Sequence, residues 1–96
     1  MTIWKNSKMS TLYYSAHASE NCNCEVQIED GKILVEYLYD GPVQYVGEEK
    51  GQGHFHLKCP AKSGDASLHR FADNSKFLEG YWVQEGNRGM WRIELA

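Results

Sequence analysis

The chain has 96 residues, of which 42% are hydrophobic and 24% charged, with a formal net charge of -3 at pH 7. This length fits one domain and excludes a large enzyme fold, and the composition is that of an ordered globular protein. Nucleic-acid binding is disfavoured, because the basic residues are scattered and form no stripe that would neutralise phosphates.

The apolar segments and the N-terminal residues predict where the protein is located, and the location predicts the state of its thiols. No window approaches the roughly 18 apolar residues of a membrane-spanning helix, so we expect no membrane partner. Residues 1–5 lack the apolar core of a signal peptide, which predicts a cytoplasmic location. Cys22, Cys24 and Cys59 are then expected to be reduced thiols. An aromatic share of 12% beside nine glycines favours strands and tight turns over helices.

The chain begins with weak patterning. We expect residues 1–10 to form a loosely structured N-terminal segment, with Trp4 either plugging one end of the domain or lying in a contact between chains. A first strand is predicted at 11–16. The clearest period-two alternation follows at 22–29, and it predicts a strand with one apolar face. That face carries Cys24, Val26 and Ile28.

A hairpin and two further strands follow. Asp30 and Gly31 suit a two-residue turn, because both positions tolerate a positive φ. The return strand is predicted at 32–40, and its two apolar faces indicate cover on both sides or contact with another chain. Shorter strands are predicted at 43–47 and 54–59.

Residues 66–71 fit two interpretations. The apolar residues fit the period of a helix, and they also fit a short strand that is followed by a turn at 72–75. We predict the strand, because every neighbouring segment is a strand of a meander.

The last third of the chain reads as an aromatic-rich hairpin. Its arms are predicted at 77–84 and 90–95 around a Gly/Asn turn at 85–89. Alternation places Trp82 and Trp91 on the inward faces, so both are predicted core residues.

The sum is an all-β, single-domain chain over 1–96. About eight short strands joined by short turns predict an antiparallel meander, either a small β-barrel or a strongly curled sheet. The strand order, with the aromatic–glycine pairing Gly80-Tyr81-Trp82 near the end, resembles the small calycin-type barrels, lipocalin-like and avidin-like, over residues 11–95. The resemblance implies barrel architecture and assigns no ligand residues.

Two patterns in the chain bear on metal binding and catalysis. Alternate strand residues such as His54 and His56 point the same way and can share an ion. Alternation turns them to solvent while Cys24 faces the core, so we predict no metal site and keep zinc as the weaker alternative. Catalysis by Cys59 would need a nearby base, and the sequence does not show that a histidine reaches it. We therefore predict no catalytic residue, and we also predict no cofactor.

The candidate binding residues are polar or aromatic side chains expected inside the barrel. His69 and Arg70 are adjacent, so one of them faces inward if 66–71 is a strand, and it then needs a partner such as Glu79 or a ligand. Tyrosine and tryptophan rings offer stacking surface with polar tips. The predicted ligand-binding set is Tyr37, Tyr45, His69, Arg70, Trp82 and Trp91.

Three functions follow from this architecture. The first is a non-catalytic protein that binds a small molecule in the barrel interior or mouth. The second is an interaction module, a homodimer joined through residues 33–39, whose barrel is filled by its own side chains. The third and least favoured is a small enzyme using histidine and carboxylates at the barrel mouth. An eight-stranded barrel is just wide enough for either filling.

Overall fold

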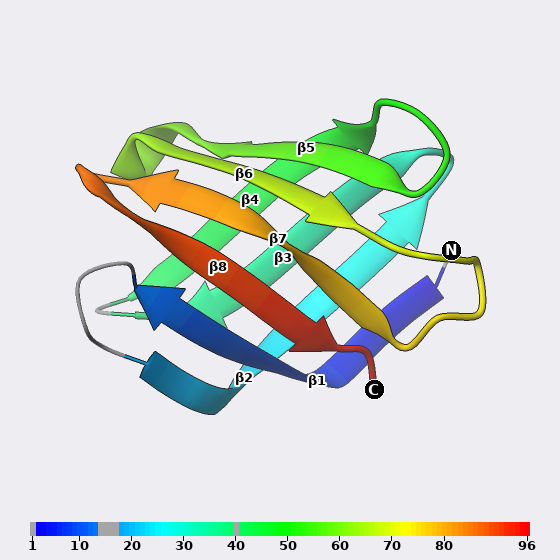
Figure 1. Ribbon diagram of the computed structural model, residues 1–96, viewed down its shortest axis with the longest axis horizontal. Coiled ribbons are helices and arrows are strands. Elements are labelled where there is room, and N and C mark those ends of the chain that lie inside the picture. The colour runs from blue at the N-terminus through cyan, green and yellow to red at the C-terminus, as the bar shows by residue number, and fades with distance from the viewer. Residues whose placement is uncertain (1, 14–17, 40) are drawn as a thin grey trace.

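The computed structural model describes residues 2–13, 18–39 and 41–96. Eight antiparallel strands pair in sequence order, and the last strand closes on the first to complete a barrel (Figure 1). The strands are β1 (Thr2–Tyr13), β2 (Ala18–Glu29), β3 (Lys32–Leu38), β4 (Pro42–Glu49), β5 (His54–Cys59), β6 (Gly64–His69), β7 (Phe77–Gln84) and β8 (Asn87–Glu94). The predicted all-β meander is confirmed, and the sheet is closed.

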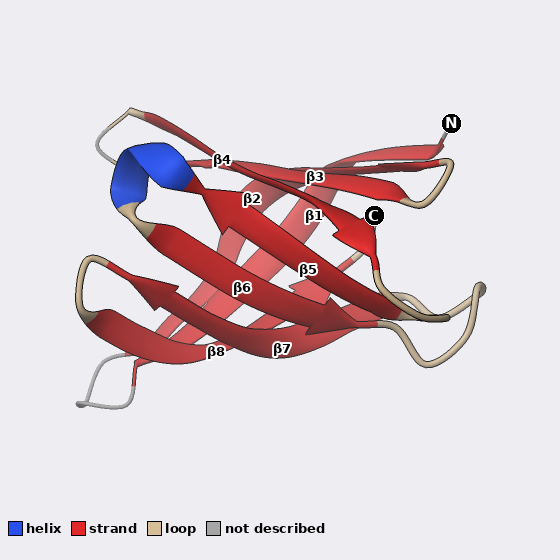
Figure 2. Cartoon of the chain, turned by 90° about the horizontal axis from the view of Figure 1, so that it is seen from above, coloured by secondary structure: helices blue, strands red, loops and turns tan. Residues whose placement is uncertain are grey.

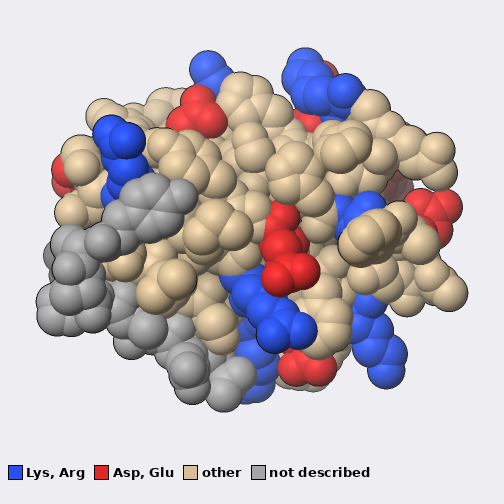
Figure 3. Space-filling model, viewed as in Figure 1, with Lys and Arg blue, Asp and Glu red and all other residues tan. Residues whose placement is uncertain are grey.

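The two ends of the barrel differ. One end carries η1 (Pro60–Lys62), the single 3-10 turn of the described chain, together with the β7–β8 turn; it lies on the left in Figures 1 and 2. The other end carries both termini and the long β6–β7 connection. No helix in the described ranges has the length and apolar character needed to cross a membrane. Basic and acidic side chains are interspersed over the face shown in Figure 3.

Two tight turns set the register of their hairpins. Asp30 and Gly31 have φ angles of 50° and 74°, the paired positive values of a type I′ turn, as the sequence predicts. Glu85 and Gly86 repeat the arrangement at 50° and 84°. This second turn is shorter than predicted: β8 begins at Asn87, because Glu85 itself takes the left-handed conformation.

The N-terminal segment differs from its sequence-based description. Residues expected to be loosely structured belong to the 12-residue strand β1. Its pairing with β2 shifts register between Trp4 and Ser7 and again between Met9 and Thr11, and such irregularities hide the alternation that marks a strand. Ser7 is fully buried and joins the two ends of the chain, because its Oγ accepts the Ala96 N–H at 3.1 Å.

The segment predicted as a strand at 66–71 is a strand, and it ends at His69. The Arg70 N–H donates to the Gly53 carbonyl oxygen at 2.7 Å, where the chain leaves the sheet. Arg70 then places its guanidinium 5.3 Å from the ring centre of Trp4, which is half-buried against the core at this end. Trp4 therefore packs at a barrel end, the place that the plug interpretation gave it.

The core is a single cluster inside the barrel. Inward-facing residues alternate with exposed ones along each strand, as in β8, where Trp91 and Ile93 are buried. Gly80 takes an inward position on β7, and a Cβ there would collide with the Ser67 carbonyl of β6. Glycine at this point lets the two strands approach and the sheet curl. The core contains Met9, Cys24, Val26, Ile33, Val35, Val43, Tyr45, Phe55, Leu57, Cys59, Ala66, Leu68, Leu78, Trp82, Trp91, Ile93 and Leu95.

Candidate functional site

A pocket of about 370 Å³ opens at the barrel end that carries the β7–β8 turn. Its lining comes from β1, β2, β3, β7 and β8 and from the turns beside them. Core side chains form its floor and exposed side chains its rim. The lining residues are Met9, Thr11, Tyr13, Cys22, Tyr37, Leu38, Tyr39, Trp82, Gln84, Glu85, Asn87 and Trp91.

Two stacked tryptophans form the floor. The Trp82 and Trp91 ring centres are 6.1 Å apart, with an interplanar angle of 23°. The β7–β8 register places each indole directly opposite a glycine: Trp82 faces Gly89, and Trp91 faces Gly80. A glycine has no side chain on the inward face, so two large rings fit side by side on neighbouring strands.

Tyrosines hold these indoles from the sides. Tyr45 and Tyr37 approach Trp91 edge-on, with ring centres 5.0 and 6.0 Å away. Tyr13 approaches Trp82 in the same way at 5.0 Å. Edge-to-face contacts are a favoured aromatic geometry, so the rings form a well-packed aromatic base.

Gln84 supplies the main polar group of the interior. Its Oε1 accepts the Tyr45 hydroxyl at 2.7 Å and the Tyr37 hydroxyl at 3.3 Å. Burial raises the pKa of both tyrosines above its ordinary value, so both hydroxyls keep their protons and donate. With its oxygen occupied, the Gln84 carboxamide has a fixed orientation. Its Nε2 has no hydrogen-bond partner among the residues that the structure describes.

The Trp82 indole provides a second donor. Trp82 is only 4% exposed, and its Nε1–H has no hydrogen-bond partner within the described part of the chain. A buried donor left unpaired costs about 1–3 kcal/mol, so native proteins rarely keep one without a purpose. Because alternate strand residues share a face, Trp82 and Gln84 both project inward from β7. One strand thus carries two inward-facing side chains with N–H donors that have no partner among the described residues, and the Trp82 donor is itself buried.

The charge of the pocket is low. Glu85 is the one charged side chain among the described lining residues, and neither lysine nor arginine is in that group. The described lining therefore offers an anionic group no lysine or arginine to pair with.

The structure brings together four of the six sequence-predicted binding residues: Tyr37, Tyr45, Trp82 and Trp91. His69 and Arg70 lie elsewhere. Leu68 takes the inward position of β6, so His69 points outward and is exposed. Arg70 lies at the opposite barrel end, where its Nε donates to the Ser75 carbonyl at 3.1 Å. Neither side chain lines the aromatic pocket, because His69 is on the outer face and Arg70 is at the other end of the barrel.

Sequence reasoning missed Tyr13 and Gln84. A signal for Gln84 was present: the alternation that turns Leu78, Gly80 and Trp82 inward also turns Gln84 inward, and a polar residue at such a position indicates a satisfied group or a site. Tyr13 gave no such signal, because the irregular pairing of β1 conceals its inward face.

Other candidate chemistry is weaker. A second hollow, of about 460 Å³, lies at the opposite end among loop residues that include Arg70 and Phe71, without a buried unpaired polar atom among the described residues. Cys24 and Cys59 are buried while His54 is exposed, so these two thiols and this imidazole face opposite ways as predicted, whereas Cys22 is exposed. Within the described ranges, no three or more His, Cys, Asp or Glu side chains are placed to hold one metal ion.

The fold and the pocket define a small antiparallel meander β-barrel with an aromatic-lined pocket at one end. No family model matches the chain. No curated protein and no solved structure matches it significantly.

Proposed function

We propose that the protein is a non-catalytic, lipocalin-like binding protein that holds one small neutral molecule in the mouth of its barrel. The observation that carries the proposal is the buried Trp82 Nε1–H without a partner among the described residues, at the floor of an open pocket. A volume of about 370 Å³ lies within the range of small-molecule sites, about 300–1,000 Å³.

The lining selects the ligand by chemistry. The indoles and the Tyr37 ring favour a flat, partly apolar molecule, and the Trp82 and Gln84 donors favour carbonyl oxygens or heteroaromatic nitrogens on it. A neutral heterocycle with one or two acceptors fits both conditions. Indole and carboxamide groups do not titrate near neutral pH, so they hold a ligand without exchanging protons with it.

The enzyme alternative receives little support from this geometry. It requires histidine and carboxylates at the mouth, and the described lining contains Glu85 and no histidine. His17, the remaining histidine of the chain, lies outside the described residues.

Native mass spectrometry of protein purified from cells tests the proposal first, followed by thermal shifts with a panel of neutral heterocycles. We expect a carried mass that is lost on denaturation, or a ligand that raises the melting temperature by binding only the folded state. Trp82→Phe keeps most of the ring surface and removes the N–H, so it should weaken binding about tenfold.

Trp4→Phe is the matched control, because Trp4 lies at the far end of the barrel and should leave affinity unchanged. The proposal is wrong if no carried mass and no thermal shift are found, or if the two variants affect binding equally.

A second proposal, homodimer formation, draws on the exposed side of β3 and β4. Leu38 is 80% exposed, Tyr39 62% and Val46 53%. A second copy of the chain covering residues 33–39 would remove this apolar surface from water. Sedimentation velocity should then show a dimer that Leu38→Lys dissociates. Leu12→Lys, at another exposed leucine on β1, should not affect it. The cytoplasmic location stays a prediction from the sequence.

A further inference from the structure

Two histidines face each other on the outer surface of the barrel. The β5–β6 register places His54 directly opposite His69. Their Nδ1 atoms are 2.8 Å apart, and the ring planes are inclined at 75°. The sequence spacing suggested His54 with His56 instead, but the His56 Nε2 lies 2.7 Å from an Asp65 carboxylate oxygen. Strand pairing, which the spacing does not reveal, therefore selects the imidazole pair.

The separation of the two nitrogens matches one coordination geometry. Imidazole nitrogens bind divalent metals at about 2.0 Å, so two of them on one ion lie about 2.8 Å apart at a 90° angle and about 3.3 Å apart at a tetrahedral angle. At 2.8 Å the two Nδ1 atoms share a hydrogen bond, and the same separation is that of adjacent corners of a square plane around one ion. Tetragonal nitrogen and oxygen coordination is typical of Cu²⁺ and Ni²⁺, and Cu²⁺ binds nitrogen ligands most tightly in the first-row series.

We propose that His54 and His69 form a cross-strand site for a tetragonal divalent metal ion, with Cu²⁺ preferred. Each neutral imidazole donates its Nδ1 lone pair to the ion. One ring carries its proton on Nδ1, and this proton moves to Nε2 when the metal binds. Both imidazoles therefore stay neutral, and the pair releases no proton. Water completes the plane.

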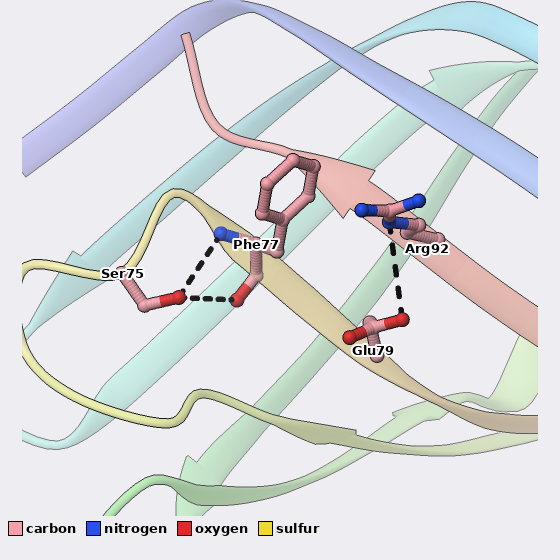
Figure 4. A network of polar contacts seen from close by, with 4 residues as sticks. All are labelled: Ser75, Phe77, Glu79 and Arg92. Atoms are coloured by element: carbon pink, nitrogen blue, oxygen red, sulfur yellow. Dashed lines mark hydrogen bonds and ion pairs between the residues drawn. The ribbon is translucent and has the colours of Figure 1, made fainter.

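The surroundings define how the site is completed. Glu79 on β7 lies directly opposite His69 in register, and its carboxylate is 3.8 Å from Arg92 Nε (Figure 4). Glu49, at the end of β4, accepts the Gly53 N–H at 2.9 Å. Both carboxylates thus contact other groups, so among the described residues the proposed site takes the two imidazoles as its protein ligands. The affinity for the metal ion then depends on chelation by one imidazole from β5 and one from β6.

The test is titration of the full chain with Cu²⁺ at pH 7.5, followed by electron paramagnetic resonance and melting temperature. Cys22→Ser serves as the background, because the exposed Cys22 thiol would bind or reduce the ion. We expect one equivalent of Cu²⁺ with a tetragonal spectrum coupled to two nitrogens. The melting temperature should rise, because the ion joins β5 to β6 only in the folded state.

Variants and a second metal make the test decisive. His54→Gln and His69→Gln should each weaken binding at least tenfold, whereas His56→Gln, on the same strand, should leave it unchanged. All three positions lie on the outer face, so the variants should keep the far-UV circular dichroism of the parent. The proposal is overturned by unchanged binding in His69→Gln, by equal loss in His56→Gln, or by Zn²⁺ binding more tightly than Cu²⁺.

Discussion

The Tyr45 hydroxyl donates a hydrogen bond of 2.7 Å to the Gln84 carboxamide oxygen and so joins β4 to β7 across the interior of the barrel. These strands are not neighbours in the sheet, so the bond crosses the interior of the barrel. The pocket extends from this part of the interior toward solvent. The Tyr37 hydroxyl reaches the same oxygen from β3. Gln84 thereby holds both tyrosine hydroxyls through its amide oxygen, which leaves its amide nitrogen pointing away from them.

Removing either partner of this bond should destabilise the fold unequally. Tyr45→Phe deletes one hydroxyl while Gln84 keeps Tyr37, and we expect a loss of about 0.5–1.5 kcal/mol. Gln84→Leu leaves the fully buried Tyr45 hydroxyl unpaired, and we expect about 1–3 kcal/mol. Urea denaturation of both variants and of the double variant measures the coupling. Strictly additive losses would contradict a direct interaction.

Gly80 should tolerate no side chain. Gly80→Ala places a Cβ against the Ser67 carbonyl of the neighbouring strand, and we expect a loss of about 3 kcal/mol or more. Gly31→Asn is the control, because no atom lies within 4 Å of its Cβ position and asparagine accepts the φ of 74° at a cost of about 1 kcal/mol. Thermal unfolding compares them, and similar losses would show that the β6–β7 approach is not the constraint.

Stability should fall at alkaline pH. Burial, with the nearby Cys22 thiol as the smaller cause, raises the pKa of Cys24 from 9.0 to about 12. Between these values the unfolded chain has lost a proton that the folded chain still holds, so the free energy of unfolding decreases as pH rises. The raised pKa values of Tyr37 and Tyr45 act in the same direction above pH 10.0.

Urea midpoints at pH 7, 9.5 and 10.5 measure this loss of stability. Cys24→Ala removes the first ionisation and should flatten the curve between pH 9 and 10. A wild-type midpoint that stays constant over this range would contradict the burial of these groups.

The three thiols should differ in reactivity. Cys22 is exposed, while Cys24 and Cys59 are each 4% exposed. A disulfide reagent at pH 8 should label one thiol of the native protein rapidly and the other two only as the barrel opens. Cys22→Ser should abolish the rapid phase. Rapid labelling that persists in this variant would place another thiol at the surface.

The sequence predicted the architecture well where strands are regular. Alternation at 22–29 and in the last hairpin placed Val26, Trp82 and Trp91 inside, and the paired positive φ angles at Asp30 and Gly31 followed from residue type. These features are local, because a side chain's face depends on its own strand and a turn depends on its own two residues. The first part of strand β1 was not predicted for the same reason, because its register shifts disturb the local alternation.

By itself, then, the sequence determined an all-β meander of about eight strands and predicted four aromatic residues, Tyr37, Tyr45, Trp82 and Trp91, whose rings pack together in the structure. Tertiary structure decided that the barrel closes, that Gln84 meets Tyr45, that His69 faces outward to His54 and that Arg70 covers Trp4. Each of these depends on how different strands pair or face one another across the barrel. That register is set by the simultaneous packing of all the inward side chains, which no single segment of the chain encodes.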